Sequence, residues 1–119
     1  MAVTVVNMIP QAMSGETNQD SEPMLAVNPD NPDHLVGTAF TPDPMGGPNA
    51  PVYVSTDGGN TWVLNPIVVG GGTLGTSDIT VAFTGSTQVL YAGILRGDQP
   101  QTAPTRLNIL KTKNFSGPS

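Results

Sequence analysis

The chain has 119 residues, a net charge of −5 and a pI near 4.3, which suits one small domain with a modest core. Its 4 Lys and Arg side chains are too few to neutralise a phosphate backbone, so we expect no nucleic-acid partner. The sequence has no long apolar run, which predicts a soluble protein without a membrane span and leaves its compartment open. The absence of Cys excludes disulfides and thiolate metal ligands.

The 14 Gly and 12 Pro residues divide the chain into short apolar runs. No window keeps apolar residues at helical spacing without an interrupting Gly or Pro, so the pattern predicts an all-β protein. Strands are expected, in chain order, near Val3–Asn7, Pro23–Asn28, His34–Thr41, Pro51–Ser55, Trp62–Val69, Ile79–Thr84, Val89–Arg96 and Arg106–Thr112.

The strands repeat along the chain, because SEPMLAV at residues 21–27 aligns with SDITVAF at residues 77–83. Continued without a gap, this alignment places strand on strand and turn on turn. The paired positions include Glu22 with Asp78, Leu25 with Val81, Ala26 with Ala82, and Gly37 with Gly93.

The repeat predicts one unit over residues 1–119 that contains two four-stranded antiparallel sheets. The first sheet takes four strands from residues 21–69, and the second takes three from residues 77–119. The spare strand at residues 3–7 would complete the second. Strands from both chain ends that share one sheet, and sheets covered on both faces, are typical of the blades of a β-propeller.

The most specific pattern in the chain is STDGGNTW at residues 55–62. It resembles the Asp box, the bacterial neuraminidase repeat of sialidase-like β-propellers, whose pattern is Ser-x-Asp-x-Gly-x-Thr-Trp. The segment at residues 21–40 also looks like the first hairpin of such blades. In the second repeat the box has decayed to KTKNFSGP, which keeps only Thr112. The positions that match the box are Ser55, Asp57, Gly59, Thr61 and Trp62.

The chemistry of the box favours a structural role. The Ser55 and Asp57 oxygens can accept hydrogen bonds from the turn backbone, and Gly58 and Gly59 permit positive φ. Trp62 would start the outer strand and cover the hairpin as the largest apolar side chain of a lean core. The box therefore predicts the fold and not an activity.

The resemblance also implies an assembly. Sialidase-like propellers have six blades, so two blades per chain imply a homotrimer that closes one ring. A larger propeller of which this chain is a fragment is the alternative. The closing strand at residues 3–7 would pair either within its own chain or with a neighbour.

Loops of an antiparallel blade alternate between its two ends, so the box turn shares an end with the turn at residues 28–34. The long loops at residues 41–50 and 97–105 and the segments that lead into each blade lie at the other end, where we expect any binding site. Glu22 and Asp78 would form a carboxylate ring there that binds a cation or polar ligand, or would cap loop amides. The candidate ligand-binding residues are Glu22, Asp78, Asp43, Arg96 and Asp98.

Catalysis is not indicated. The resemblance would imply a three-arginine cluster and a Tyr-Glu pair, but the chain has only Arg96 and Arg106, and Tyr53 and Tyr91 fall within strands where core packing is expected. His34 fits a solvated turn. We expect no metal site and no cofactor.

Three classes of function remain: a carbohydrate-binding, lectin-like module with a glycan ligand, a structural propeller assembly unit, and a fragment of a sialidase-like glycoside hydrolase. The first is preferred because polar loops recur on a rigid scaffold, although fold alone does not determine function.

Overall fold

A computed structural model of the chain describes residues 2–9, 21–40, 49–65, 67–68, 75–85, 88–97 and 105–116. Every regular element within these ranges is a β-strand, which confirms the all-β class. The same ranges hold no helix with the length and hydropathy that a membrane span needs. The propeller ring and the trimer stay predictions.

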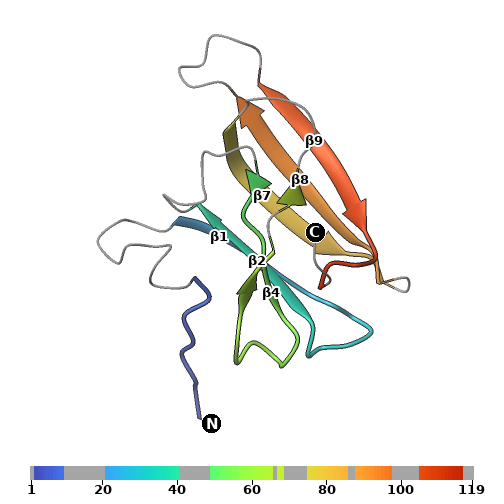
Figure 1. Cartoon of the computed structure of the whole chain (residues 1–119). Coiled ribbons are helices and arrows are strands. Elements are labelled where there is room, and N and C mark those ends of the chain that lie inside the picture. The colour runs from blue at the N-terminus through green and yellow to red at the C-terminus, as the bar shows by residue number, and fades with distance from the viewer. Residues whose placement is uncertain are drawn as a thin grey trace.

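Two antiparallel sheets dominate the fold (Figure 1). The first sheet has the order β1-β2-β4-β5, from β1 (Ser21–Val27), β2 (Leu35–Phe40), β4 (Tyr53–Ser55) and β5 (Val63–Leu64). The second has the order β7-β8-β9, from β7 (Gly75–Phe83), β8 (Leu90–Gly97) and β9 (Arg106–Thr112). Consecutive strands are therefore neighbours in both, as the sequence predicts for blades.

Two expected strands differ from the structure. The strand expected at Trp62–Val69 is divided into β5 and β6 (Ile67–Val68), and β6 pairs instead with β3 (Asn49–Ala50). The intervening Pro66 has no N–H to donate to a ladder. Residues 2–7 form no strand with the described part of the same chain, so the expected strand at Val3–Asn7 is not found there.

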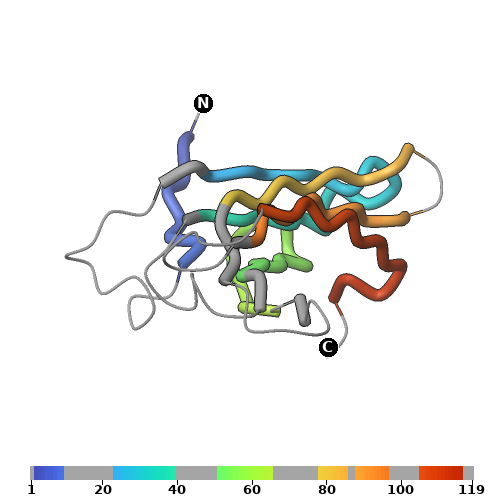
Figure 2. Tube along the Cα trace, turned by 90° about the horizontal axis from the view of Figure 1, so that it is seen from above, coloured from blue at the N-terminus to red at the C-terminus, as the bar shows by residue number. Residues whose placement is uncertain are grey.

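The core lies between the two sheets, where β7 packs against β1 and β2. Figure 2 shows the β1–β2 hairpin running alongside the β7–β8 hairpin. Thr38 ties the layers together by donating its hydroxyl proton to the Ile79 carbonyl, 3.2 Å away. The buried core residues are Ala26, Val36, Val52, Val54, Ile79, Val81, Leu90, Ala92, Ile94 and Phe115.

The hydrogen-bond phase of the first sheet shows which of its faces meets this core. Asn28 donates its N–H to the His34 carbonyl at 2.9 Å, so this opposed pair is a hydrogen-bonded pair. Such pairs alternate with non-hydrogen-bonded ones along a ladder. Ala26 and Val36 oppose each other two positions further along, in the same phase, and both point into the core. The core face of the first sheet therefore carries the hydrogen-bonded pairs of its first two strands.

The second sheet has the opposite phase. Thr84 donates its N–H to the Val89 carbonyl at 2.9 Å, which makes that pair hydrogen-bonded. Val81 and Ala92 oppose each other three positions further along, so they form a non-hydrogen-bonded pair, yet they too point into the core. The core face of the second sheet therefore carries its non-hydrogen-bonded pairs.

The difference in phase means that the two sheets are stacked front to back. In a strand of L-residues, the direction of a side chain and the side on which that residue's N–H and C=O lie are linked by chirality. Equivalent faces would thus show the same phase. Because the phases differ, the core face of one sheet corresponds to the outer face of the other, the face that points away from the core. This is the relation between successive units of a repeat that can be continued, rather than the face-to-face relation of a two-fold pair.

The phases also test the alignment of the repeat. Leu25 and Val81 both lie in non-hydrogen-bonded pairs, which agrees with the ungapped alignment in the first strand. Gly37 opposes Leu25, whereas Gly93 opposes Thr80 in a hydrogen-bonded pair, so these two glycines are not structurally equivalent. The hairpin turns differ in length, and the alignment needs a one-residue shift after the first strand.

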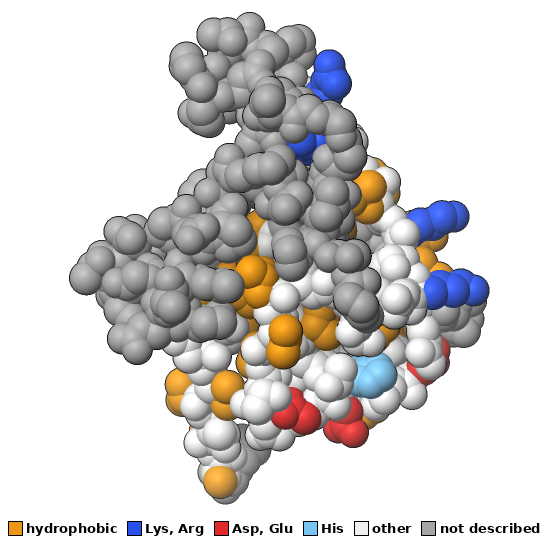
Figure 3. All heavy atoms as spheres, viewed as in Figure 1, with side chains coloured by type: hydrophobic (Ala, Val, Ile, Leu, Met, Phe, Trp, Pro, Cys, Tyr) orange, Lys and Arg blue, Asp and Glu red, His pale blue; other side chains and the backbone are white. Residues whose placement is uncertain are grey.

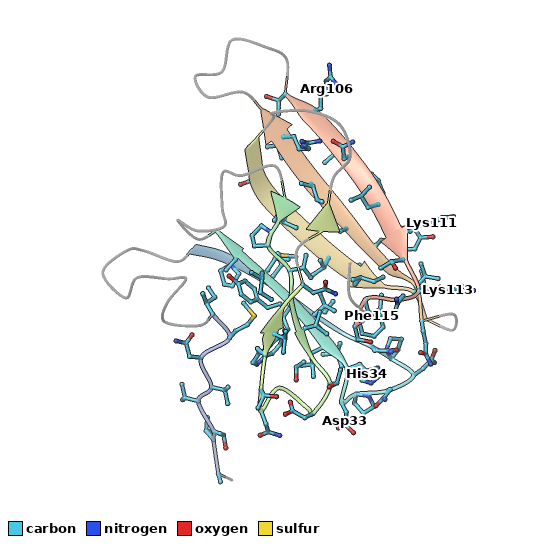
Figure 4. All side chains as sticks on the ribbon, viewed as in Figure 1. Asp33, His34, Arg106, Lys111, Lys113 and Phe115 are labelled. Carbon is cyan, nitrogen blue, oxygen red and sulfur yellow. The ribbon has the colours of Figure 1, made fainter. Side chains whose placement is uncertain are left out.

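Phe115 joins the two sheets at the end that holds the Asp-box turn. Its ring packs edge-on against His34 and Phe83, with centroids 5.6 Å and 5.0 Å away, and its carbonyl accepts a 2.8 Å hydrogen bond from the Asn65 side chain (Figure 4). His34 is thus half-buried against Phe115, and the expectation of a solvated turn histidine is wrong.

We predict that Phe115→Ala lowers the free energy of unfolding by about 3–5 kcal/mol, because it removes a buried aromatic ring shared by both sheets. Urea titration followed by circular dichroism measures this. The exposed neighbour provides the control: Ser116→Ala should change stability by less than about 0.5 kcal/mol. Equal stability of the two variants would contradict the role assigned to Phe115.

Candidate functional site

The Asp-box turn, residues 55–62, is held together by its own side chains. The Ser55 hydroxyl donates to Asp57 Oδ1 at 2.8 Å and accepts from the Gly59 N–H at 2.9 Å. Thr61 donates its N–H to Asp57 Oδ1 at 2.9 Å and its hydroxyl proton to Oδ2 at 2.6 Å. Gly58 and Gly59 have φ of +71° and +86°, which residues with a Cβ adopt only under strain.

These hydrogen bonds favour the ionised form of Asp57. They lower the pKa of its carboxyl from 3.8 to about 2, mainly through the Thr61 hydroxyl, then the Thr61 N–H and the Ser55 hydroxyl. Both carboxylate oxygens are occupied by the turn itself. A carboxyl group whose pKa is lowered in this way is a poor proton donor, so the hydrogen bonds and the pKa support the structural role that the sequence predicts.

Trp62 closes the turn and covers one face of the first sheet. Its indole N–H donates to the Gly59 carbonyl at 3.0 Å, and its ring packs with Met8, Tyr53 and Leu64 on the outer face of that sheet. The side chain is only partly buried. Trp62 therefore belongs to a second cluster, separate from the core between the sheets.

The structure confirms that the box turn shares an end with the turn at residues 28–34, whereas most of the two long loops expected at the other end lies outside the described residues. Gly58 of the box turn donates its N–H to the carbonyl of Asp33, in the turn between β1 and β2, at 3.0 Å. Phe115, which follows β9, contacts His34 of the same turn, so the second sheet has its corresponding end there. We call this the box end, and the end at which β1 and β7 begin the opposite end.

We predict that Asp57→Asn removes a pH-dependent part of the stability. Since folding lowers the pKa of Asp57 to about 2, its contribution is complete above 3.8 and is lost as the pH falls through about 2. The difference in unfolding free energy between the native protein and the variant should therefore shrink on acidification from neutral pH. Urea titrations at several pH values measure it, and a difference that does not change with pH would contradict the assignment.

The five candidate ligand residues have different outcomes. Asp43 and Asp98 lie outside the described residues, as does the side chain of Glu22 in β1. Arg96 in β8 is only 3 % exposed, so in this chain its side chain is packed rather than presented to solvent. Asp78 in β7 is exposed and lies at the opposite end, as expected. The predicted pair of carboxylates at Glu22 and Asp78 stays a prediction.

Asp78 borders a shallow hollow of about 420 Å³ where the start of β1 meets β7. The hollow extends over the outer face of the second sheet, and its floor is mainly apolar. Thr80 adds a hydroxyl group, and a Cβ at Gly93 would come within 2.9 Å of the Thr80 methyl carbon, so Gly93 keeps the floor open. The lining residues are Pro23, Met24, Asp78, Ile79, Thr80, Gly93, Leu95 and Leu107.

The sequence did not indicate this apolar floor, because Leu95 and Leu107 lie on neighbouring strands and meet only through the register of β8 and β9.

The two tyrosines differ in burial. Tyr53 is fully buried, as expected. Tyr91 is exposed on the outer face of the second sheet, so the expectation that it packs in the core is wrong.

Among the described residues, no three His, Asp or Glu side chains gather as a bound metal ion would require. Comparison with known proteins gives no match to family models, to curated proteins or to solved structures. The inference about function therefore depends on the Asp box, the stacking of the sheets and the hollow beside Asp78.

Proposed function

We propose that this chain is a two-blade unit of an Asp-box β-propeller and that it binds carbohydrate at the end opposite the box. The front-to-back stacking of the two sheets is the observation that carries the first part, because only this relation repeats around a ring. The ordered Asp-box turn supports it, since the turn connects the third and fourth strands of the first sheet.

The hollow beside Asp78 supports carbohydrate as the ligand class. A sugar ring has an apolar face and a rim of hydroxyl groups. The apolar floor formed by Leu95 and Leu107 suits the face, while the Asp78 carboxylate and the Thr80 hydroxyl at the border suit the rim. Catalysis is not part of the proposal, because Asp78 is the one carboxylate among the described residues that line the hollow, and Asp57 lies at the box end.

A structural assembly unit without a ligand is the second candidate. It is favoured by the large apolar side chains that the single chain leaves exposed on the outer faces of both sheets, such as Leu25 and Ile109. The two candidates differ in what happens at Asp78, and the following measurement separates them.

We predict that a glycan array identifies a sugar that binds to this protein. Asp78→Asn should weaken the affinity for that sugar by roughly ten- to a hundredfold in calorimetry, the usual effect of losing a charged hydrogen bond. Asp30→Asn removes an exposed carboxylate at the box end and should leave the affinity unchanged. An array without any binding glycan would overturn carbohydrate binding and leave assembly as the function. Equal affinities of the two variants would overturn the placement of the site beside Asp78.

A further inference from the structure

The outer face of the second sheet presents a row of apolar side chains with no partner in the described part of the chain. Leu107 and Ile109 of β9 are 67 % and 64 % exposed, and Tyr91 of β8 is also exposed beside them. They alternate with residues on the core face, so all three point the same way. An apolar face of this kind is typical of a protein interface. Among the described strands β9 pairs with β8 alone, so its other edge is open there and borders this face.

The outer face of the first sheet is partly covered by the N-terminal segment. Met8 lies directly over Gly37, where any Cβ would collide with its sulfur, and Ile9 is buried against Ala39 and Tyr53. The Asn7 side chain fixes the bend before them by accepting the Ile9 N–H at 3.1 Å. This anchor holds the segment on the first sheet.

Residues 2–7, which precede the anchor, are exposed along their whole length. Val5 is 93 % exposed, although Val and Thr at residues 3–6 strongly favour strands. In Figure 1 the segment runs from beyond the box end toward the anchor, on the far side of the first sheet from β9. It is therefore separated from the open edge of β9 in its own chain by the core.

We propose that the outer face of the first sheet and residues 3–7 together form the docking site for the second sheet of another copy of this chain. Residues 3–7 would add to β9 of that copy as its fourth strand. The proposal deepens the proposed function, because it applies the front-to-back relation of the two sheets to successive chains. The outer face of the first sheet corresponds to the core face of the second, so the contact between chains repeats the contact within one.

The chain directions agree with this pairing. β9 runs toward the box end, and residues 2–7 run away from it (Figure 1). Rotation about a ring axis preserves the sense of each direction along that axis, so we expect the segment to meet β9 of a neighbour antiparallel, as in the other ladders of the sheet. A groove of about 410 Å³ between the segment, β1 and the box turn leaves room for side chains of the docked face. Thr4, Val6, Met8, Leu25 and Trp62 are among its lining residues.

Charges at the box end are complementary between the two faces. Exposed Lys111 lies near the end of β9 and exposed Lys113 follows it, while exposed acidic residues Asp30, Asp33 and Asp57 occupy the turns of the first sheet. Figure 3 shows basic side chains at the right edge of the molecule and acidic side chains below them. Head-to-tail docking brings the lysines of one copy to the acidic turns of the next, whereas two-fold docking of identical faces would place like charges together.

Sedimentation equilibrium with matched variants tests the docked faces. Ile109→Asp should convert a concentration-dependent oligomer to a monomer. Val63→Asp is the control, because Val63 is 66 % exposed on the core-face side of β5, away from both outer faces. It should assemble like the native chain. Since both side chains are exposed in the single chain, folding is preserved, and circular dichroism checks this. A native chain that stays monomeric, or equal assembly of both variants, would overturn the docking.

Cysteine cross-linking tests the strand exchange separately, and the chain has no Cys of its own. Val5→Cys and Lys111→Cys chains, mixed and treated with a short bis-maleimide, should give a covalent dimer of the two variants. The control mixture of Val5→Cys with Val63→Cys should not. A cross-link only within a chain that carries both Val5→Cys and Lys111→Cys would overturn the exchange. Neither result depends on sugar binding, so failure here is distinguishable from failure of the carbohydrate assignment.

Discussion

The opposite hydrogen-bond phases of the two core faces are the constraint on which the rest of this molecule depends. Val36 of β2 and Ile94 of β8 are fully buried between sheets that present non-equivalent faces to each other. Chirality links the direction of a side chain to the direction of the hydrogen bonds of its residue. The two faces in contact therefore cannot be related by a two-fold axis. This contact leaves one outer face of each kind, of which that of the first sheet is partly covered by the N-terminal segment, and we propose that these two faces complement each other. Core packing, the exposed apolar rows and the inferred mode of assembly thus share one cause.

The Asp box supports this arrangement locally. Both carboxylate oxygens of Asp57 accept hydrogen bonds, from Ser55 and Thr61, and the Trp62 indole N–H donates a hydrogen bond to the Gly59 carbonyl. The turn then joins the β1–β2 turn through Gly58 and Asp33. A carboxylate used in this way orders the box end. The chemistry available for recognition is at the opposite end, beside Asp78, where the side chain is exposed and its surroundings are hollow.

In the proposed function, the apolar outer faces connect assembly with ligand binding. The hollow beside Asp78 extends over the outer face of the second sheet, through Leu95 and Leu107. A chain docked on that face would form one wall of the hollow and deepen it. Binding sites between packed units are common, because the junction is concave and its walls are apolar. In this arrangement, each site would be complete only in the assembled protein.

The sequence by itself determined most strands of the two main sheets, their consecutive order and the turn at residues 55–62, because these depend on residues near one another along the chain. Short apolar runs, Gly and Pro at turns, and the spacing of Ser55, Asp57 and Thr61 are all local signals. The sequence did not predict the division of the Trp62–Val69 strand or the absence of a strand at residues 3–7 in the described chain. It misjudged the exposure of Tyr91 and His34, which depends on distant strands. Three features were decided by the tertiary structure alone. They are the hydrogen-bond phase of the two core faces, the packing of Phe115 between the two sheets and the position of Met8 over Gly37. Each requires segments far apart in sequence to meet at a defined register, and composition and spacing carry no information about that register.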